Sequence, residues 1–175
     1  MNRRYAQEVT GPDPAPLSGD DLAAWSALAT VLERLPAALD AQLLHDSGLS
    51  HFEYGLLYAL AAAPERTLRM STLAGFANCS LSRLSRAVAR LEARGCVERC
   101  PDPEDGRTTL AMLTQAGAAQ QAQAAPGHET LVRAAVLDPL TARQRRELQA
   151  IAATIAGALH PDGAWTPPTD DRAAW

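Results

Sequence analysis

The sequence is poor in cysteine and in aromatic residues, and it has no lysine. Aromatic residues make up 5% of its 175 residues, and arginine supplies all 16 of its basic side chains. Three cysteines, an odd number outside any dense framework, exclude a small fold held by disulfides and favour a reducing compartment. These absences predict a cytoplasmic protein that folds around an apolar core, which a chain of this length can build.

Several sequence features that would point to other classes of protein are also missing. There is no run of 18 or more apolar residues, so we expect no membrane span. The first 20 residues are polar and proline-bearing, unlike a secretory signal. No glycine-rich phosphate loop, Gly-x-Ser-x-Gly elbow or His-Glu-x-x-His motif is present. We therefore expect no enzyme and no cofactor.

The histidines and cysteines do not form a metal-binding pattern. The four histidines are scattered along the chain, at His45, His51, His128 and His160. Cys96 and Cys100 are spaced as one ligand pair, but the second pair that a structural zinc requires is missing. The sequence therefore predicts no metal site.

Residues 80–95 have the pattern of a short amphipathic helix. Ser80 is a suitable N-cap, and an apolar row at helical spacing ends at a glycine: Leu84, Val88, Leu91 and Gly95. A second row, displaced from the first, carries Arg83, Arg86, Arg90 and Arg94. A helix with such a row suits the major groove of double-stranded DNA. The alternative is the solvated face of an ordinary helix.

A β-hairpin is predicted directly after this helix. Residues 97–99 and 108–113 can form strands, and the segment CPDPEDG between them is rich in turn-forming residues. Arg107 follows Asp105 and Gly106, and an acidic neighbour can hold the planar guanidinium group of an arginine in one orientation. Alone, the hairpin could be any charged surface loop. After an arginine-rich helix it is typical of the wing of a winged helix-turn-helix.

The charge of the whole chain does not indicate DNA binding, but its distribution does. The formal net charge is −4. Between residues 66 and 94, however, six arginines face a single acid, Glu92. Local distribution matters more than the total for an electrostatic surface.

Residues 81–117 resemble the MarR family of bacterial transcription regulators. The resemblance rests on the serine-rich helix, on Leu91-Glu92 with Gly95 and Val97, on Asp105-Gly106-Arg107, and on Leu113-Thr114-Gln115-Ala116-Gly117. It implies a homodimer that binds a pseudo-palindromic operator and represses until a small ligand or oxidation releases it. The matching DNA-binding positions are Ser80, Ser82, Arg83, Ser85, Arg86, Arg90 and Arg107, with Asp105 bracing Arg107. Gly106 and the two nearby cysteines depart from the usual pattern.

The expected fold is mainly α with a small β-hairpin wing. Residues 18–160 are predicted to form a single domain between disordered tails at 1–17 and 161–175. Within it, the winged helix-turn-helix covers about 48–113, and helices at about 18–45 and 114–160 form a dimerisation layer. Pro36 should kink or break the first helix, and Pro126-Gly127 should interrupt a later one. The last helix is expected to bury Leu148, Ile151, Ile155 and Leu159.

The sequence also offers candidates for an effector site and for a redox site. The family pocket between the dimerisation helices and the DNA-binding lobe points to Trp25, Leu28, Leu32, His51, Tyr54 and Tyr58. Such a site would suit a small aromatic or phenolic effector, although these residues could simply fill the junction. Cys79, at the start of the arginine-rich helix, is the candidate redox residue. A buried or incidental cysteine is the alternative.

A function outside transcription control stays open at this point. A dimeric winged-helix protein that has lost specific DNA binding would serve as a protein-interaction module, and the acidic wing leaves room for it. The arginine row together with Arg107 favours DNA binding over the interaction module, because a module that does not bind DNA has no need of both features.

Overall fold

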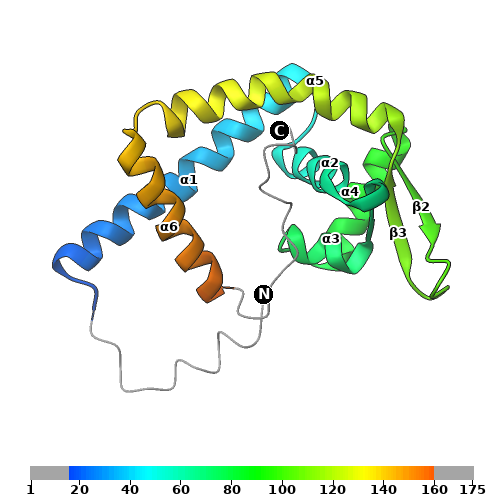
Figure 1. The fold of residues 1–175 in the computed structure, drawn as a ribbon, viewed down its shortest axis with the longest axis horizontal. Coiled ribbons are helices and arrows are strands. Elements are labelled where there is room, and N and C mark those ends of the chain that lie inside the picture. Colours follow the sequence, from blue (N-terminus) through cyan, green and yellow to red (C-terminus); the bar gives the residue numbers. More distant parts are fainter. Residues whose placement is uncertain (1–15, 160–175) are drawn as a thin grey trace. The chain divides into compact units, whose positions relative to one another are not determined.

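The computed structural model describes residues 16–159. The helices and strands follow one another as α1 Gly19–Ser47, α2 His51–Ala62, β1 Thr67–Arg69, α3 Met70–Phe76, α4 Leu81–Ala93, β2 Val97–Pro101, β3 Thr109–Leu113, α5 Gln115–Val132 and α6 Ala142–Leu159 (Figure 1). The mainly helical class with a small β wing is thereby confirmed. Apart from residues 16 and 17, the two predicted tails lie outside the described residues.

The chain divides into two units, of which the first ends at Leu35 and the second begins at Pro36. The second unit contains one apolar core, which α2, α3, α4 and the sheet build together. Its fully buried large side chains include Leu57, Leu60, Leu73, Leu84 and Leu91. Burial of several leucines at about 25 cal/mol per Å² is the main force that holds this winged helix-turn-helix lobe together.

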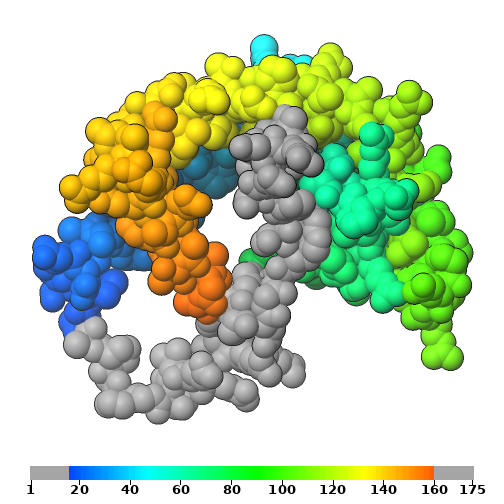
Figure 2. All heavy atoms as spheres, viewed as in Figure 1, coloured from blue at the N-terminus to red at the C-terminus, as the bar shows by residue number. Residues whose placement is uncertain are grey.

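The sheet has three antiparallel strands in the order β1-β3-β2. Leu68 of β1 lies opposite Ala111 of β3, and Val97 of β2 lies opposite Leu113. These pairs close one side of the core, since all four residues are buried. β2 and β3 continue as a hairpin whose tip projects beyond the rest of the lobe (Figure 2). This hairpin is the predicted wing.

Local signals set the ends of the helices in the lobe. The Ser50 hydroxyl accepts from the Glu53 backbone N–H at the start of α2, and the Glu53 carboxylate accepts from the Ser50 backbone N–H. The two hydrogen bonds complete a capping box. The Ser80 hydroxyl accepts from the Arg83 N–H at the start of α4. The tight turn between α3 and α4 places Asn78 at φ 44°, and Gly95 ends α4 at φ 70°. A glycine adopts that left-handed conformation without steric cost, so the predicted glycine stop is confirmed.

Neither Pro36 nor Pro126 breaks its helix, so the predicted break at each position is wrong, while a kink at Pro36 stays a prediction. Helix α1 runs through Pro36, and helix α5 runs through Pro126. A proline leaves the carbonyl four residues before it without its helical partner. Both Leu32 and Ala122, which carry those carbonyls, are exposed, so water can satisfy the groups. Helix α5 ends instead at a π-helical turn, Arg133–Leu137.

The terminal helices carry their apolar residues at the surface. In α6, Leu148, Ile151, Ile155 and Leu159 are between 40% and 58% exposed in the single chain, so their burial in a dimerisation layer stays a prediction. Leu22, Trp25, Leu28 and Leu32 of α1 are likewise exposed. By length and composition alone α1 could cross a membrane, but one such helix near an N-terminus is weak support for a span.

Candidate nucleic-acid interface

Helix α4 has one buried stripe, one outermost face and one exposed side toward α2. Its buried stripe consists of Leu84, Ala87, Val88 and Leu91, which anchor it in the core. With about 3.6 residues per turn, Ser82, Arg86 and Ala89 lie opposite that stripe and form the outermost face. All three are exposed. Arg83, Arg90 and Arg94 lie to one side of this face, toward α2.

The arginines on the side toward α2 are held by other parts of the lobe. The Arg83 guanidinium lies 4.7 Å from the centre of the Phe52 ring. Arg90 Nε donates to Glu53 Oε1 at 2.8 Å. Arg94 donates to the carbonyls of Gly48 and Ser47 at 2.9 and 3.3 Å. Of the four arginines predicted to form one solvent-facing row, three therefore contact other parts of the lobe, and the fourth is Arg86.

Arg86 differs from these three because no hydrogen bond or ion pair of its side chain occurs within residues 16–159. It shares the outermost face of α4 with Ser82, whose hydroxyl is also exposed. Ser85 is half-buried and lies on the side of α4 toward the wing. Arg86 and Ser82 are thus the side chains best placed to reach into a groove of DNA.

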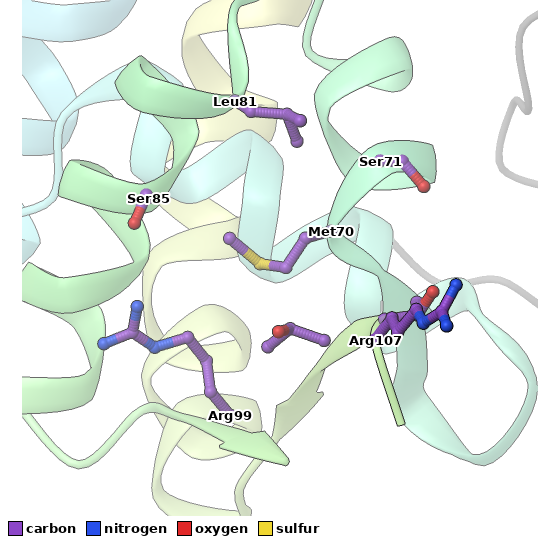
Figure 3. Close-up of a pocket in the computed structure, with 8 residues that line it drawn as sticks. Met70, Ser71, Leu81, Ser85, Arg99 and Arg107 are labelled. Atoms are coloured by element: carbon purple, nitrogen blue, oxygen red, sulfur yellow. The ribbon is translucent and has the colours of Figure 1, made fainter. Parts of the chain in front are cut away.

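An open groove of about 340 Å³ separates α4 from the wing. Met70 and Leu81 form an apolar floor, and the polar lining comes from Ser71, Ser85, Arg99, Arg107, Thr108 and Thr109. Figure 3 shows Arg99 and Arg107 on opposite sides of Met70. Arg99 Nε donates to Glu92 Oε2 at 3.0 Å, so the charge of Arg99 is paired within the lobe. The hydroxyl groups and Arg107 are the part of the lining that suits the sugar–phosphate backbone of DNA.

The wing is held in place by two aspartates. Asp102 is 6% exposed, and its Oδ2 accepts from Arg69 Nε and Nη2 at 2.9 Å. The backbone N–H of Glu104 and the Arg69 guanidinium hold the pKa of Asp102 below its ordinary value. Asp105 accepts from the Arg107 backbone N–H at 3.1 Å and from the Thr108 hydroxyl at 3.0 Å. Asp105 thus orders the backbone that carries Arg107; in this structure it does not bind the guanidinium.

Several residues of this surface were missed by sequence reasoning. Glu53, Arg69, Arg99 and Asp102 all hold or line the interface, but none was predicted to do so. Ser50-x-x-Glu53 is a readable capping box, yet its link to Arg90 joins positions 37 residues apart. Asp102 and Arg69 are separated by 33 residues. No periodicity or local motif reports pairs at that separation.

The predicted effector residues are only partly brought together. His51 and Tyr54 of α2 both lie near His128 of α5, with ring centres 5.9 and 4.7 Å from that ring. Tyr54 and Tyr58 are buried, and burial raises the pKa of both phenols. Trp25, Leu28 and Leu32 are exposed and belong to the first unit. The effector site therefore stays a prediction.

The three cysteines are free thiols in different environments. Cys79 is half-buried and packs against the lobe core beside the start of α4. Cys96 is buried, burial raises its pKa, and its Sγ lies 2.9 Å from Gln120 Oε1. A raised pKa disfavours the reactive thiolate, so Cys96 is unsuited to redox sensing. The redox role of Cys79 is untested.

No metal centre is apparent in the described part of the chain. Within residues 16–159, no group of three or more His, Cys, Asp or Glu side chains could hold a metal ion.

The fold and this surface define a winged helix-turn-helix protein, and known proteins show the same architecture. Residues 47–108 match the model of the MarR family. The chain is 41% identical to Sco3205, a MarR family transcriptional regulator from Streptomyces coelicolor solved in complex with DNA. That match covers 90% of this chain and 98% of the other, with a TM-score of 0.82.

Two further solved structures from Streptomyces coelicolor extend the comparison. AbsC, a MarR family transcriptional regulator, is 30% identical over 85% of this chain and 100% of its own, with a TM-score of 0.79. PcaV, a transcriptional regulator solved with its natural ligand, is 25% identical over 82% and 99%, with a TM-score of 0.65. No curated protein sequence matched the chain. At these identities and coverages, the chain belongs to the MarR family, as the resemblance predicted.

Proposed function

We propose that this protein is a ligand-responsive transcription repressor that binds a pseudo-palindromic DNA operator as a homodimer. The observation that carries the proposal is the outermost face of α4, where Ser82 and Arg86 project beside a groove that ends at the wing. A non-enzymatic, cytoplasmic role fits this proposal. DNA binding by the relative Sco3205, which is 41% identical, supports it.

In the proposed complex, different elements contact different parts of the DNA. Helix α4 enters the major groove, where Ser82 and Arg86 reach base edges and Ser80, Arg83 and Arg90 lie nearer the backbone. The DNA strand that borders this groove lies between α4 and the wing, against Ser85 and the threonines at the base of the wing. Arg107 extends from the wing to the minor groove or the phosphates beside it.

The exposed apolar rows support a homodimer. A soluble protein rarely leaves a continuous apolar row in water, because burying it against a partner is favourable. In α6 that row is Leu148, Ile151, Ile155 and Leu159, and in α1 it includes Leu22 and Trp25. A second copy of the chain would cover both rows and would present two α4 helices to successive major grooves.

Ligand response is the third part of the proposal. PcaV, 25% identical, was solved with its natural ligand, and His51, Tyr54 and His128 form a polar group between α2 and α5. An aromatic or phenolic effector that changes this packing would change the orientation of the lobe. Oxidation of Cys79 is the alternative trigger, and retained peroxide sensitivity in Cys79→Ser would rule it out.

The test is selection of fragmented genomic DNA on the purified protein, followed by sequencing. We expect a few palindromic sites to be enriched, with half-sites about one helical turn apart. Arg86→Ala should then weaken binding to the selected site by about 1–3 kcal/mol and relax the base preference at one position per half-site. Uniform, salt-sensitive recovery of all fragments would contradict specific recognition and favour the interaction module.

A matched control separates a base contact from general charge. Arg133 lies in the π-helical turn outside the lobe and is exposed. Arg133→Ala removes the same charge as Arg86→Ala but should leave the base preference unchanged. Equal losses on the selected site and on a scrambled duplex for Arg86→Ala would mean that Arg86 contacts phosphate rather than bases.

A further inference from the structure

Glu53 is a buried acid that the proposed function does not use. It is 7% exposed, and it lies in α2 rather than on a surface that reaches DNA. One carboxylate oxygen accepts from the Ser50 backbone N–H at 3.1 Å, and the other accepts from Arg90 Nε at 2.8 Å. Glu53 therefore joins the start of α2 to the third turn of α4.

The ion pair leaves most of the Arg90 guanidinium available. The Arg90 side chain is 60% exposed, although its Nε is bound to a carboxylate that is 9% exposed. An arginine has donors on three nitrogens in one plane. The two terminal nitrogens make no hydrogen bond within residues 16–159, so with Nε held by Glu53 their remaining donors are available on the exposed side of α4.

Glu53 remains charged in this position. Burial alone would raise its pKa, but the hydrogen bonds from Arg90 and Ser50 outweigh burial and lower the pKa below its ordinary value. A negative charge close to the DNA-binding helix should weaken binding to a polyanion.

We propose that Glu53 is a positioning residue of the DNA interface, which holds Arg90 so that its terminal nitrogens meet a backbone phosphate. An arginine that is already held loses less side-chain freedom on binding than one that is free in water. A phosphate is the expected target because Arg90 lies toward α2, away from the outermost face that carries Ser82 and Arg86. This inference rests on the proposed DNA-binding function and adds a residue to it.

The sign of one substitution separates positioning from plain electrostatics. Glu53→Gln removes the charge, and glutamine still serves at this position of a capping box. Plain electrostatics predicts tighter DNA binding once an acid is removed. Positioning predicts weaker binding, by roughly three- to ten-fold, because one charge-assisted hydrogen bond to phosphate is loosened. Fluorescence anisotropy of the full-length protein measures this with the genomically selected duplex and with a scrambled duplex.

A double-mutant cycle ties the effect to Arg90. Arg90→Ala should weaken binding to both duplexes alike and lower the salt slope by about one. In the Arg90→Ala background, Glu53→Gln should cause no further loss, because nothing is left to position. Glu98→Gln is the matched control: Glu98 is exposed on β2 and makes no hydrogen bond or ion pair within the described residues. This control should not weaken binding.

A second variant tests whether a loss of binding in Glu53→Gln comes from a folding defect instead. Arg90→Lys leaves Glu53 and the α2 cap intact and keeps the positive charge, but it lacks the Nε–H and the planar fork. It should lose about as much affinity as Glu53→Gln. Binding that is unchanged or tighter in Glu53→Gln, or unchanged in Arg90→Ala, overturns the inference. Loss of any preference of the wild-type protein for the selected duplex would instead overturn the proposed function.

Discussion

The winged helix-turn-helix lobe and the terminal helices place their apolar residues differently. In the lobe, Leu57, Leu84 and Leu91 are fully buried within one chain. In α6, Ile151 and Leu159 are 58% and 52% exposed, although their spacing is just as regular. The same kind of helical pattern therefore leads to an intramolecular core in one region and to an uncovered surface in the other.

This difference shows that amphipathic spacing reports a face to be buried but not its partner. The lobe has enough elements around α4 to close a core by itself. Within the described residues, the apolar row of α6 stays exposed, and the proposed homodimer would cover it. Stability of the lobe should then depend on its own packing, whereas stability of α6 should depend on protein concentration.

The largest expected effect is a cavity in the lobe. Leu91→Ala should lower the free energy of unfolding by about 2–5 kcal/mol, because a fully buried leucine is truncated without full collapse of the site. Urea unfolding at several protein concentrations measures this. Leu148→Ala on α6 is the matched control and should act mainly on dimer affinity. A similar loss from both variants at low protein concentration would erase the distinction between the two regions.

A charge on the apolar row of α6 should separate the protomers. Ile151→Asp should weaken dimerisation by about 2 kcal/mol or more, because an unpaired carboxylate would enter an apolar interface. Light scattering should then show a shift toward monomer, and the melting temperature should stop rising with concentration. Gln149→Asp adds the same charge to the same helix off this row and should leave the dimer intact. A dimeric Ile151→Asp protein would mean that α6 is not the interface.

A smaller, pH-dependent effect is expected where α2 meets α5. Burial lowers the pKa of His51 and of His128 below 6.5, and the neighbouring His51 ring lowers the pKa of His128 further. The unfolded chain therefore takes up protons near pH 6.5 while the folded chain does not, so the free energy of unfolding should fall as pH decreases below about 6.5. The lowered pKa values of the Glu53 and Asp102 carboxyl groups affect the free energy of unfolding only at lower pH, near and below the ordinary pKa values of 4.5 and 3.8.

Substitution of one histidine tests this assignment. His128→Gln should flatten the loss of stability between pH 6.5 and 5, measured by urea unfolding across that range. His45→Gln is the control, because the side chain of His45 is 86% exposed and lies outside this contact. A slope that is unchanged in His128→Gln would place the pH dependence elsewhere.

The smallest effect on stability is expected at the wing tip. Arg107 is exposed, so Arg107→Ala should change the free energy of unfolding by no more than about 0.5 kcal/mol. It should still weaken DNA binding and lower the salt slope by about one. A thermal melt and a salt titration of DNA affinity check the two expectations. A large loss of stability would show that the tip supports the fold.

Much of the fold could be predicted from the sequence because its signals are local. The N-cap at Ser80, the glycine stop at Gly95 and the turn-rich wing all act within a few residues. Propensity failed at Pro36 and Pro126, where exposed carbonyls allow a helix to continue through a proline. The candidate interface was predicted in outline through Ser82, Arg86 and Arg107, whose assigned roles have yet to be tested.

By itself, the sequence determined which helices form, where the wing turns, and that arginines gather on α4. The tertiary structure sets the contacts of each arginine: Arg83 lies against Phe52, Arg90 is bound by Glu53, and Arg94 caps the end of α1. The Arg86 side chain makes no hydrogen bond or ion pair within residues 16–159. The physical reason is the distance along the sequence over which each interaction acts. Helix periodicity and capping depend on neighbours within about four residues, whereas the partner of a charge is chosen by which segments the core brings together.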